Sequence, residues 1–179
     1  MMYDEIVRIH YFHEVERRRD LNSSLTLPLG VLTALFAAIA AMLGSVSIPL
    51  DQVEKILLTL CSFSALAGGV AISYALRAVI GYTYRHPTSM GSLAQWREKA
   101  LAEGISSYRV DEDIQRIMAD QYAKGAEKNS TNNDRKSGYI HTTGIWVAIC
   151  LALVILSGLP YVYSRMMAAP TSAPAVGAE

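Results

Sequence analysis

The residues that could bind a metal or a haem are histidines. His10 and His13 stand three positions apart with Glu14 next to them, so a helix would place both imidazoles on one face. No third ligand follows in the same motif, and we expect no metal site. A haem held between membrane helices needs two facing histidines. His86 and His141 instead fall at helix ends on one side of the membrane, so we expect no cofactor.

The sequence motifs of catalysis are also missing. The chain contains no phosphate-binding glycine-rich loop and no G-x-S-x-G nucleophile motif. Its long apolar stretches contain no acidic residue, although proton-coupled transport normally requires one. We therefore predict a protein that is not an enzyme. The formal net charge of zero indicates no nucleic-acid partner.

The most unusual polar segment spans residues 129–136, where three asparagines occur within five positions. Asparagine is a poor helix former, so this composition needs a reason. If the segment is helical, Asn129 and Asn133 fall on the inward stripe of the helix and could hydrogen-bond to a neighbouring helix. The alternatives are a loop, or a cytoplasmic site for an anionic headgroup, a nucleotide or a partner, formed by Asn129, Asn133, Arg135 and Lys136.

Three apolar stretches must position these residues. Residues 25–46 carry no charge, residues 56–80 carry only Arg77, and a third stretch covers about 140–162. About 20 apolar helical residues cross a hydrocarbon core of roughly 30 Å. The link over 47–55 is so short that the first two stretches must run antiparallel. We predict an all-α integral membrane protein with three transmembrane helices and a cytoplasmic helical hairpin.

Lysine and arginine residues set the orientation. Four precede the first span, nine lie between the second and third spans, and only Lys55 and Arg165 fall on the other side. The positive-inside rule then places the N-terminus and the 82–138 loop in the cytoplasm and the C-terminus outside the cell inner membrane. The predicted regions are a cytoplasmic amphipathic helix over 1–24, a transmembrane hairpin over 25–81, a cytoplasmic helical region over 82–138, a third span over 139–164 and a disordered external tail over 165–179.

Local patterns predict where several helices begin and which sides they bury. An i, i+4 stripe of Tyr3, Val7, Tyr11 and Val15 marks the buried side of the N-terminal helix. Asp51 and Glu54 form a capping box for the second span. Three acidic residues at 111–113 suit the first turn of a later helix.

That later helix can continue into the third span, because no proline occurs from Thr88 to Leu159. Helical steps extend its apolar stripe through positions further along the segment, namely Ala126, Asn129, Asn133, Lys136 and Ile140.

Small residues recur at four-residue steps in the first two spans. In lipid, small residues allow backbones to approach closely and therefore mark packed faces. We expect these faces to close the hairpin or to join protomers; they consist of Gly30, Ala34, Ala38, Ala65, Gly69 and Ser73. Residues expected at the membrane interface are Arg77, Tyr82, Tyr84, Trp146 and Tyr161.

The order of elements resembles the small bacterial SLATT-type transmembrane effectors of nucleotide-signalling defence systems. The shared features are the charged helix over 3–20, the close hairpin over 25–80 and the polar stretch over 129–136. The third span is an addition to the usual two-span layout of that family. The resemblance implies an effector that forms pores or disrupts the membrane once a partner or second messenger makes it assemble. It identifies no functional residue.

Two functions follow from these observations. The first is a non-enzymatic, homo-oligomerising membrane protein, a defence or signalling effector that assembles in the inner membrane on a cytoplasmic cue. Its partners would be the lipid bilayer, further copies of itself, and a cytoplasmic protein or a nucleotide second messenger. The alternative is a passive membrane anchor or scaffold subunit for a soluble enzyme.

Overall fold

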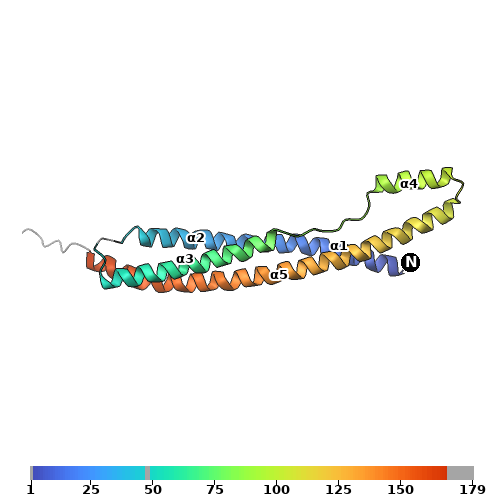
Figure 1. Cartoon of the computed structure of the whole chain (residues 1–179). Helices are drawn as coiled ribbons and strands as arrows, with labels where there is room; N and C mark the ends of the chain where they lie inside the picture. Colours follow the sequence, from blue (N-terminus) through green and yellow to red (C-terminus); the bar gives the residue numbers. More distant parts are fainter. Residues whose placement is uncertain (1, 47–48, 169–179) are drawn as a thin grey trace, which may run out of the picture. The chain divides into compact units, whose positions relative to one another are not determined.

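The structure is a computed structural model that describes residues 2–46 and 49–168, and within these ranges every element is an α-helix. The all-α prediction is therefore confirmed for the described residues. The helices, labelled in Figure 1, are α1 (Met2–Ser24), α2 (Thr26–Leu43), α3 (Gln52–Val79), α4 (Met90–Ala102) and α5 (Ser107–Ala168).

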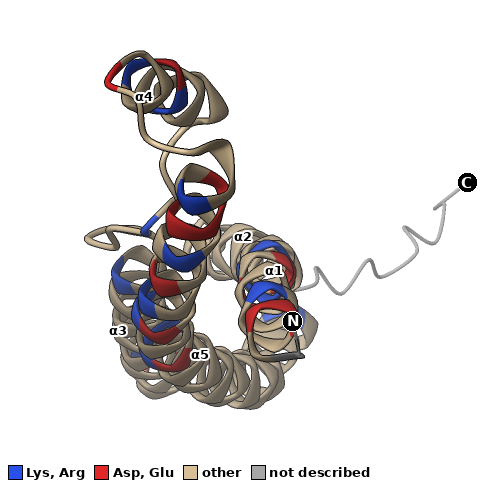
Figure 2. Cartoon of the chain, turned by 90° about the vertical axis from the view of Figure 1, so that its right-hand side faces the viewer, with Lys and Arg blue, Asp and Glu red and all other residues tan. Residues whose placement is uncertain are grey.

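Three helical stretches are long and apolar enough to cross a membrane. They lie within Tyr3–Leu43, Gln52–Val79 and Ser107–Met167. The chain also divides into two compact units. We call Met1–Thr26 with Ala75–His141 the polar unit, and Leu27–Tyr74 with Thr142–Glu179 the apolar unit. The ribbon positions of Lys, Arg, Asp and Glu, coloured in Figure 2, are concentrated on α1, α4 and the first part of α5.

The boundaries of the helices follow local chemistry. α1 ends at Ser24 and α2 restarts at Thr26, so Pro28 falls in the first turn of α2, where its missing N–H costs little. The predicted capping box is confirmed before α3. The Glu54 N–H donates to Asp51 Oδ1 at 2.6 Å, and the Asp51 N–H donates to Glu54 Oε2 at 3.1 Å.

α5 is one helix from Ser107 to Ala168, so it continues into the third apolar stretch, as the absence of proline allows (Figure 1). The prediction that Asp111 opens this helix is wrong, because the helix begins four residues earlier and Val110 is already buried in it. The helix also passes Pro160. The prediction of a disordered tail is therefore wrong for 165–168, and the rest of that tail, 169–179, lies outside the described residues.

Buried positions along α5 alternate in steps of three and four residues, the spacing of a left-handed coiled-coil seam. In the polar unit this confirms the predicted inward stripe, with Ile140 half-buried at its end. The buried residues of the seam are Ala126, Asn129, Asn133 and Lys136 in the polar unit, and Thr143, Val147, Cys150, Val154 and Ser157 in the apolar unit.

The same spacing corrects the predicted stripe of α1. Tyr11 and Glu14 are buried and Val7 is half-buried, whereas Tyr3 is 66% exposed and Val15 is 36% exposed. Steps of four residues drift around an α-helix, whereas alternating steps of three and four stay on one side. A charged residue, Glu14, therefore occupies an inward position that hydrophobicity alone assigns to Val15.

The segment between α3 and α4 is not helical. Gly81 has a φ of +92°, which favours glycine, and residues 82–89 have no regular secondary structure. α4 then begins with Ser89 as its N-cap, whose side chain accepts from the Ser92 N–H. The region predicted as helical over 82–138 therefore begins with a non-helical stretch at 82–89.

In the apolar unit, α2, α3 and α5 share one core. Small residues let the helices approach closely, and a Cβ at Gly68 would lie 2.7 Å from a ring carbon of Phe36. Ser64 is fully buried, with its hydroxyl bonded to the carbonyl of Leu60 at 2.8 Å. The core contains Leu35, Ile39, Leu57, Cys61, Ala67, Cys150 and Val154.

Most of the small residues expected to close the hairpin lie on exposed sides of their helices. Gly30, Ala34, Gly69 and Ser73 are exposed, so the hairpin-closing alternative is wrong for these four, while Ala38 and Ala65 are half-buried. Both spans carry small residues on more than one side, and α3 packs through a neighbouring side formed by Ser64, Ala67, Gly68, Ala71 and Ala75.

Replacing Gly68 by Leu tests the packing of the apolar unit. We expect the free energy of unfolding in mild detergent to fall by about 1–3 kcal/mol, because the added side chain meets the Phe36 ring. Gly144→Leu is the matched control, since a Cβ at Gly144 meets nothing within 4 Å. Equal unfolding transitions for the two variants would contradict this packing.

Candidate functional site

The candidate site is a set of buried polar side chains in the polar unit, which we call the polar seam. It consists of Asn129, Asn132, Asn133 and Lys136 on α5 together with Glu14 on α1, all at most 8% exposed. Burying a polar group costs free energy unless it finds hydrogen-bond partners. The partners of these side chains therefore determine how the segments of this unit are arranged.

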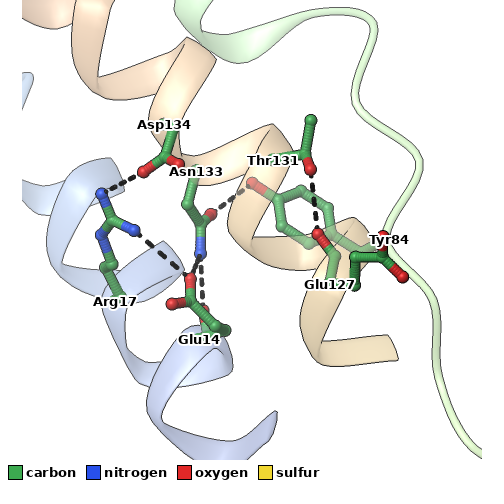
Figure 3. A network of polar contacts seen from close by, with 7 residues as sticks. All are labelled: Glu14, Arg17, Tyr84, Glu127, Thr131, Asn133 and Asp134. Atoms are coloured by element: carbon green, nitrogen blue, oxygen red, sulfur yellow. Dashed lines mark hydrogen bonds and ion pairs between the residues drawn. The ribbon is translucent and has the colours of Figure 1, made fainter. Parts of the chain in front are cut away.

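Asn133 lies at the centre of the polar seam and uses both ends of its amide (Figure 3). Its Nδ2 donates to the backbone carbonyl of Glu14 at 2.8 Å and to Glu14 Oε2 at 2.9 Å. Its Oδ1 accepts from the Tyr84 hydroxyl at 3.0 Å. One side chain of α5 thus binds both α1 and the segment 82–89. Its bonds to α1 are the interhelical hydrogen bonds expected if residues 129–136 are helical.

Arginines of α1 complete the network around Asn133. Arg17 forms ion pairs with Asp134 at 2.7 Å and with Glu14 at 3.5 Å, which compensates the buried Glu14 carboxylate. The hydrogen bond to Asp134 is the main cause that raises the pKa of Arg17 above its ordinary value. The guanidinium of Arg18 lies 3.9 Å from the ring centre of Tyr84, a cation–π contact.

Three further amide side chains of α5 hold the extended segment 82–89. Asn129 accepts from the Arg85 N–H at 3.0 Å and donates to the Arg85 carbonyl at 3.3 Å, so it pairs with this residue as a neighbouring strand would. Asn132 Nδ2 donates to the Thr83 carbonyl at 2.9 Å. Gln121 accepts from the Thr88 N–H at 2.6 Å and donates to its hydroxyl at 2.7 Å.

A tyrosine of α1 packs against the same segment of α5. A Cβ at Gly125 would lie 3.0 Å from the Tyr11 ring, so a larger residue there would require this ring to shift by a few tenths of an ångström. The Tyr11 hydroxyl lies 3.4 Å from the Arg85 carbonyl and 3.4 Å from His86 Nδ1. Burial is the main cause that raises the pKa of Tyr11 above its ordinary value.

Lys136 is the buried cation of the polar seam. It is 3% exposed, and its ammonium group donates to the side-chain oxygen of Asn22. Burial, assisted by the charge of Arg18, lowers the pKa of Lys136 from its ordinary value. A neutral amide compensates this charge far less than a carboxylate would, so we expect the burial of Lys136 to cost stability.

Three of the four residues proposed as a ligand site belong to the polar seam, and the fourth does not. Asn129, Asn133 and Lys136 are buried and bonded to protein groups, while Arg135 is exposed. Sequence reasoning missed Glu14 and Gln121. The available signal was the repetition of amide side chains on the stripe of α5, opposite a segment that contains Gly81 and Pro87.

The predicted interface residues occupy varied surroundings. Tyr84 belongs to the polar network, and Tyr82 is half-buried with a ring 6.5 Å from that of Tyr84. Arg77 is exposed on the last turn of α3. Trp146 and Tyr161 are half-buried and pack against the core of the apolar unit.

An open groove of about 640 Å³ lies beside the polar seam, between residues 83–85 and α5. Three of its lining residues are cationic, namely Arg85, Lys124 and Lys128, and Glu127 is the acidic one. Among the residues that the structure describes, no group of three His, Cys, Asp or Glu side chains could hold a metal ion.

Comparisons with protein-family models, curated proteins and solved structures found no match. What this region can bind is therefore inferred from its own residues alone. The polar seam binds three segments together through buried amides. The neighbouring groove presents cationic side chains to solvent.

Replacing Asn133 by Leu tests the centre of the polar seam. We expect the free energy of unfolding to fall by about 1–3 kcal/mol for each polar group left unsatisfied, here Glu14 and Tyr84. The control is Thr131→Leu, since Thr131 is exposed and its hydroxyl bonds only to its own helix. Unfolding in mild detergent, followed by circular dichroism, measures both. Equal destabilisation would show that Asn133 does not hold these segments.

Replacing Lys136 by Met should have the opposite effect. Removing a buried charge that lacks a carboxylate partner should raise the free energy of unfolding by about 1 kcal/mol or more at neutral pH. The exposed Lys128→Met should change it by less than about 0.5 kcal/mol.

The pH dependence of this difference is a separate test. The folded protein binds the Lys136 proton less tightly than the unfolded chain, whose lysine pKa is 10.5. Wild-type stability should therefore rise relative to Lys136→Met as the pH increases through the folded pKa towards 10.5. A constant difference from neutral to alkaline pH would contradict the unfavourable burial of this charge.

Proposed function

We propose that this chain is a non-enzymatic membrane protein that self-associates in a bacterial inner membrane, as a signalling or defence effector whose polar unit receives a cytoplasmic cue. Three helices with the length and composition of membrane spans support the embedding. The polar unit contains the Lys- and Arg-rich residues 82–138, which the positive-inside rule assigns to the cytoplasm. The order of elements resembles that of the SLATT-type effectors.

The observation that carries the proposal is the position of the small residues. A Cβ at Gly30 or at Gly69 would meet nothing within 4 Å, although the helices of the apolar unit pack closely through other small residues. Ala34 and Ser73, one turn further along each helix, are exposed as well. In lipid, exposed glycines spaced with other small residues favour the docking of another helix.

α5 offers a route by which a cue could affect assembly. It contributes the polar seam to one unit and buried positions such as Val147 and Cys150 to the core of the other. A cytoplasmic partner or a nucleotide that displaced α5 in the polar unit would act on the same helix that packs between the apolar helices. We infer that α5 carries the signal.

Gly69→Leu tests the assembly face. Chemical crosslinking and native mass measurements on the full chain in lipid nanodiscs or mild detergent should show a shift from oligomers towards monomers. Gly91→Leu is the control, because Gly91 is an exposed glycine on α4, outside the apolar helices. An unchanged oligomer distribution for Gly69→Leu would remove this face from the proposal.

The alternative function is a membrane anchor for a soluble partner. One observation favours it: large apolar side chains are exposed on α4 and at the start of α5, with Met90 at 76% and Tyr108 at 79%. Purification in mild detergent distinguishes the two functions. An anchor brings down a stoichiometric partner protein, whereas a self-associating effector brings down only further copies of itself.

A further inference from the structure

The groove between residues 83–85 and α5 has features that neither the polar seam nor the assembly face uses. Its volume of about 640 Å³ lies within the range of small-molecule sites. We propose that this groove binds a phosphate group, either of a small phosphorylated molecule or of an anionic lipid. The proposal does not require self-association.

Charge is the first reason. Arg85 comes from the extended segment, and Lys124 and Lys128 come from neighbouring turns of α5, so cations line both sides of the groove. Glu127 is the carboxylate that opposes them. Lys124 is paired with Asp120 at 2.7 Å, but both side chains are more than half exposed, and such surface pairs contribute little. An arriving phosphate can therefore recruit Lys124 at low cost.

Rigidity is the second reason. Both backbone groups of Arg85 are bonded to Asn129, and the carbonyl of Thr83 is bonded to Asn132. The wall that carries the arginine is thus fixed before any ligand arrives. A site whose backbone is already ordered loses less conformational entropy on binding.

The side chains also suit phosphate chemistry. The Arg85 side chain is exposed while its backbone is fixed, and a guanidinium can donate two parallel hydrogen bonds to phosphate oxygens. Lys128, one turn beyond Lys124 on α5, adds a compact charge. Tyr84, which contacts Asn133 and Arg18, forms part of the same wall.

The direct test measures binding to the full-length protein in mild detergent, with inorganic pyrophosphate as the probe in calorimetry. We expect saturable binding that weakens by about tenfold or more in Arg85→Gln and in Lys128→Gln, since each loses a charge-assisted contact. Lys99→Gln, which removes an exposed lysine of α4 outside the groove, is the matched control and should bind as wild type does.

A gain-of-affinity variant separates loss of binding from loss of fold. Glu127→Gln removes the carboxylate from the groove and should tighten pyrophosphate binding several-fold, an effect that misfolding cannot produce. A second arm replaces pyrophosphate by nanodiscs that contain phosphatidylglycerol, with phosphatidylcholine nanodiscs as the reference. Stabilisation by phosphatidylglycerol that depends on Arg85 and Lys128, without pyrophosphate binding, assigns the site to a lipid headgroup.

Two results would overturn the proposal. One is the absence of saturable binding in both arms. The other is an equal loss of binding in Lys99→Gln and Lys128→Gln, which would indicate general charge attraction and not a site. Binding and oligomeric state are measured separately. Failure of phosphate binding would not contradict the self-association proposal, and failure of self-association would not contradict phosphate binding in the groove.

Discussion

The polar unit depends on one constraint, which is that a buried amide must find hydrogen-bond partners. Asn129, Asn132 and Asn133 occupy or flank positions of α5 where a coiled coil normally places apolar side chains. Apolar side chains there would bind a neighbouring helix through shape alone. The amides instead select partners with particular donors and acceptors, namely the backbone of α1 and of residues 83–85. The non-helical segment is ordered because α5 supplies the partners that its backbone lacks.

Along α5 the same spacing of inward positions serves two kinds of packing. In the polar unit, hydrogen bonds and the Arg17 ion pairs compensate the burial of polar groups. In the apolar unit, small side chains bring the helices together, and Ser64 and Ser157 bond within their own helices. In the polar unit, hydrogen bonding therefore specifies which segments meet. In the apolar unit, close packing does so. α5 thus contributes buried positions to both the polar seam and the apolar core.

Periodicity and local capping made much of the fold predictable. The helices, the Asp51–Glu54 capping box, the unbroken α5 and its inward stripe all follow from interactions between residues close in sequence. The extended segment 82–89 could not be predicted in this way, because its order comes from side chains more than 30 residues further along the chain, such as Asn129 for Arg85. The side of α3 that packs against its neighbours could not be predicted from the sequence either, because α3 carries small residues on several sides. The close approach of the Phe36 ring to Gly68 shows which side is packed.

Amide hydrogen exchange across residues 82–89 tests most directly whether the polar seam orders this segment. The full-length protein in mild detergent should show slow exchange at the Arg85 and Thr88 N–H groups, which donate to Asn129 and Gln121. Exchange should be faster at the neighbouring Tyr84 and His86. Equally fast exchange at all four positions, at the rate of an unstructured peptide, would contradict the claim that side chains of α5 hold this segment in place.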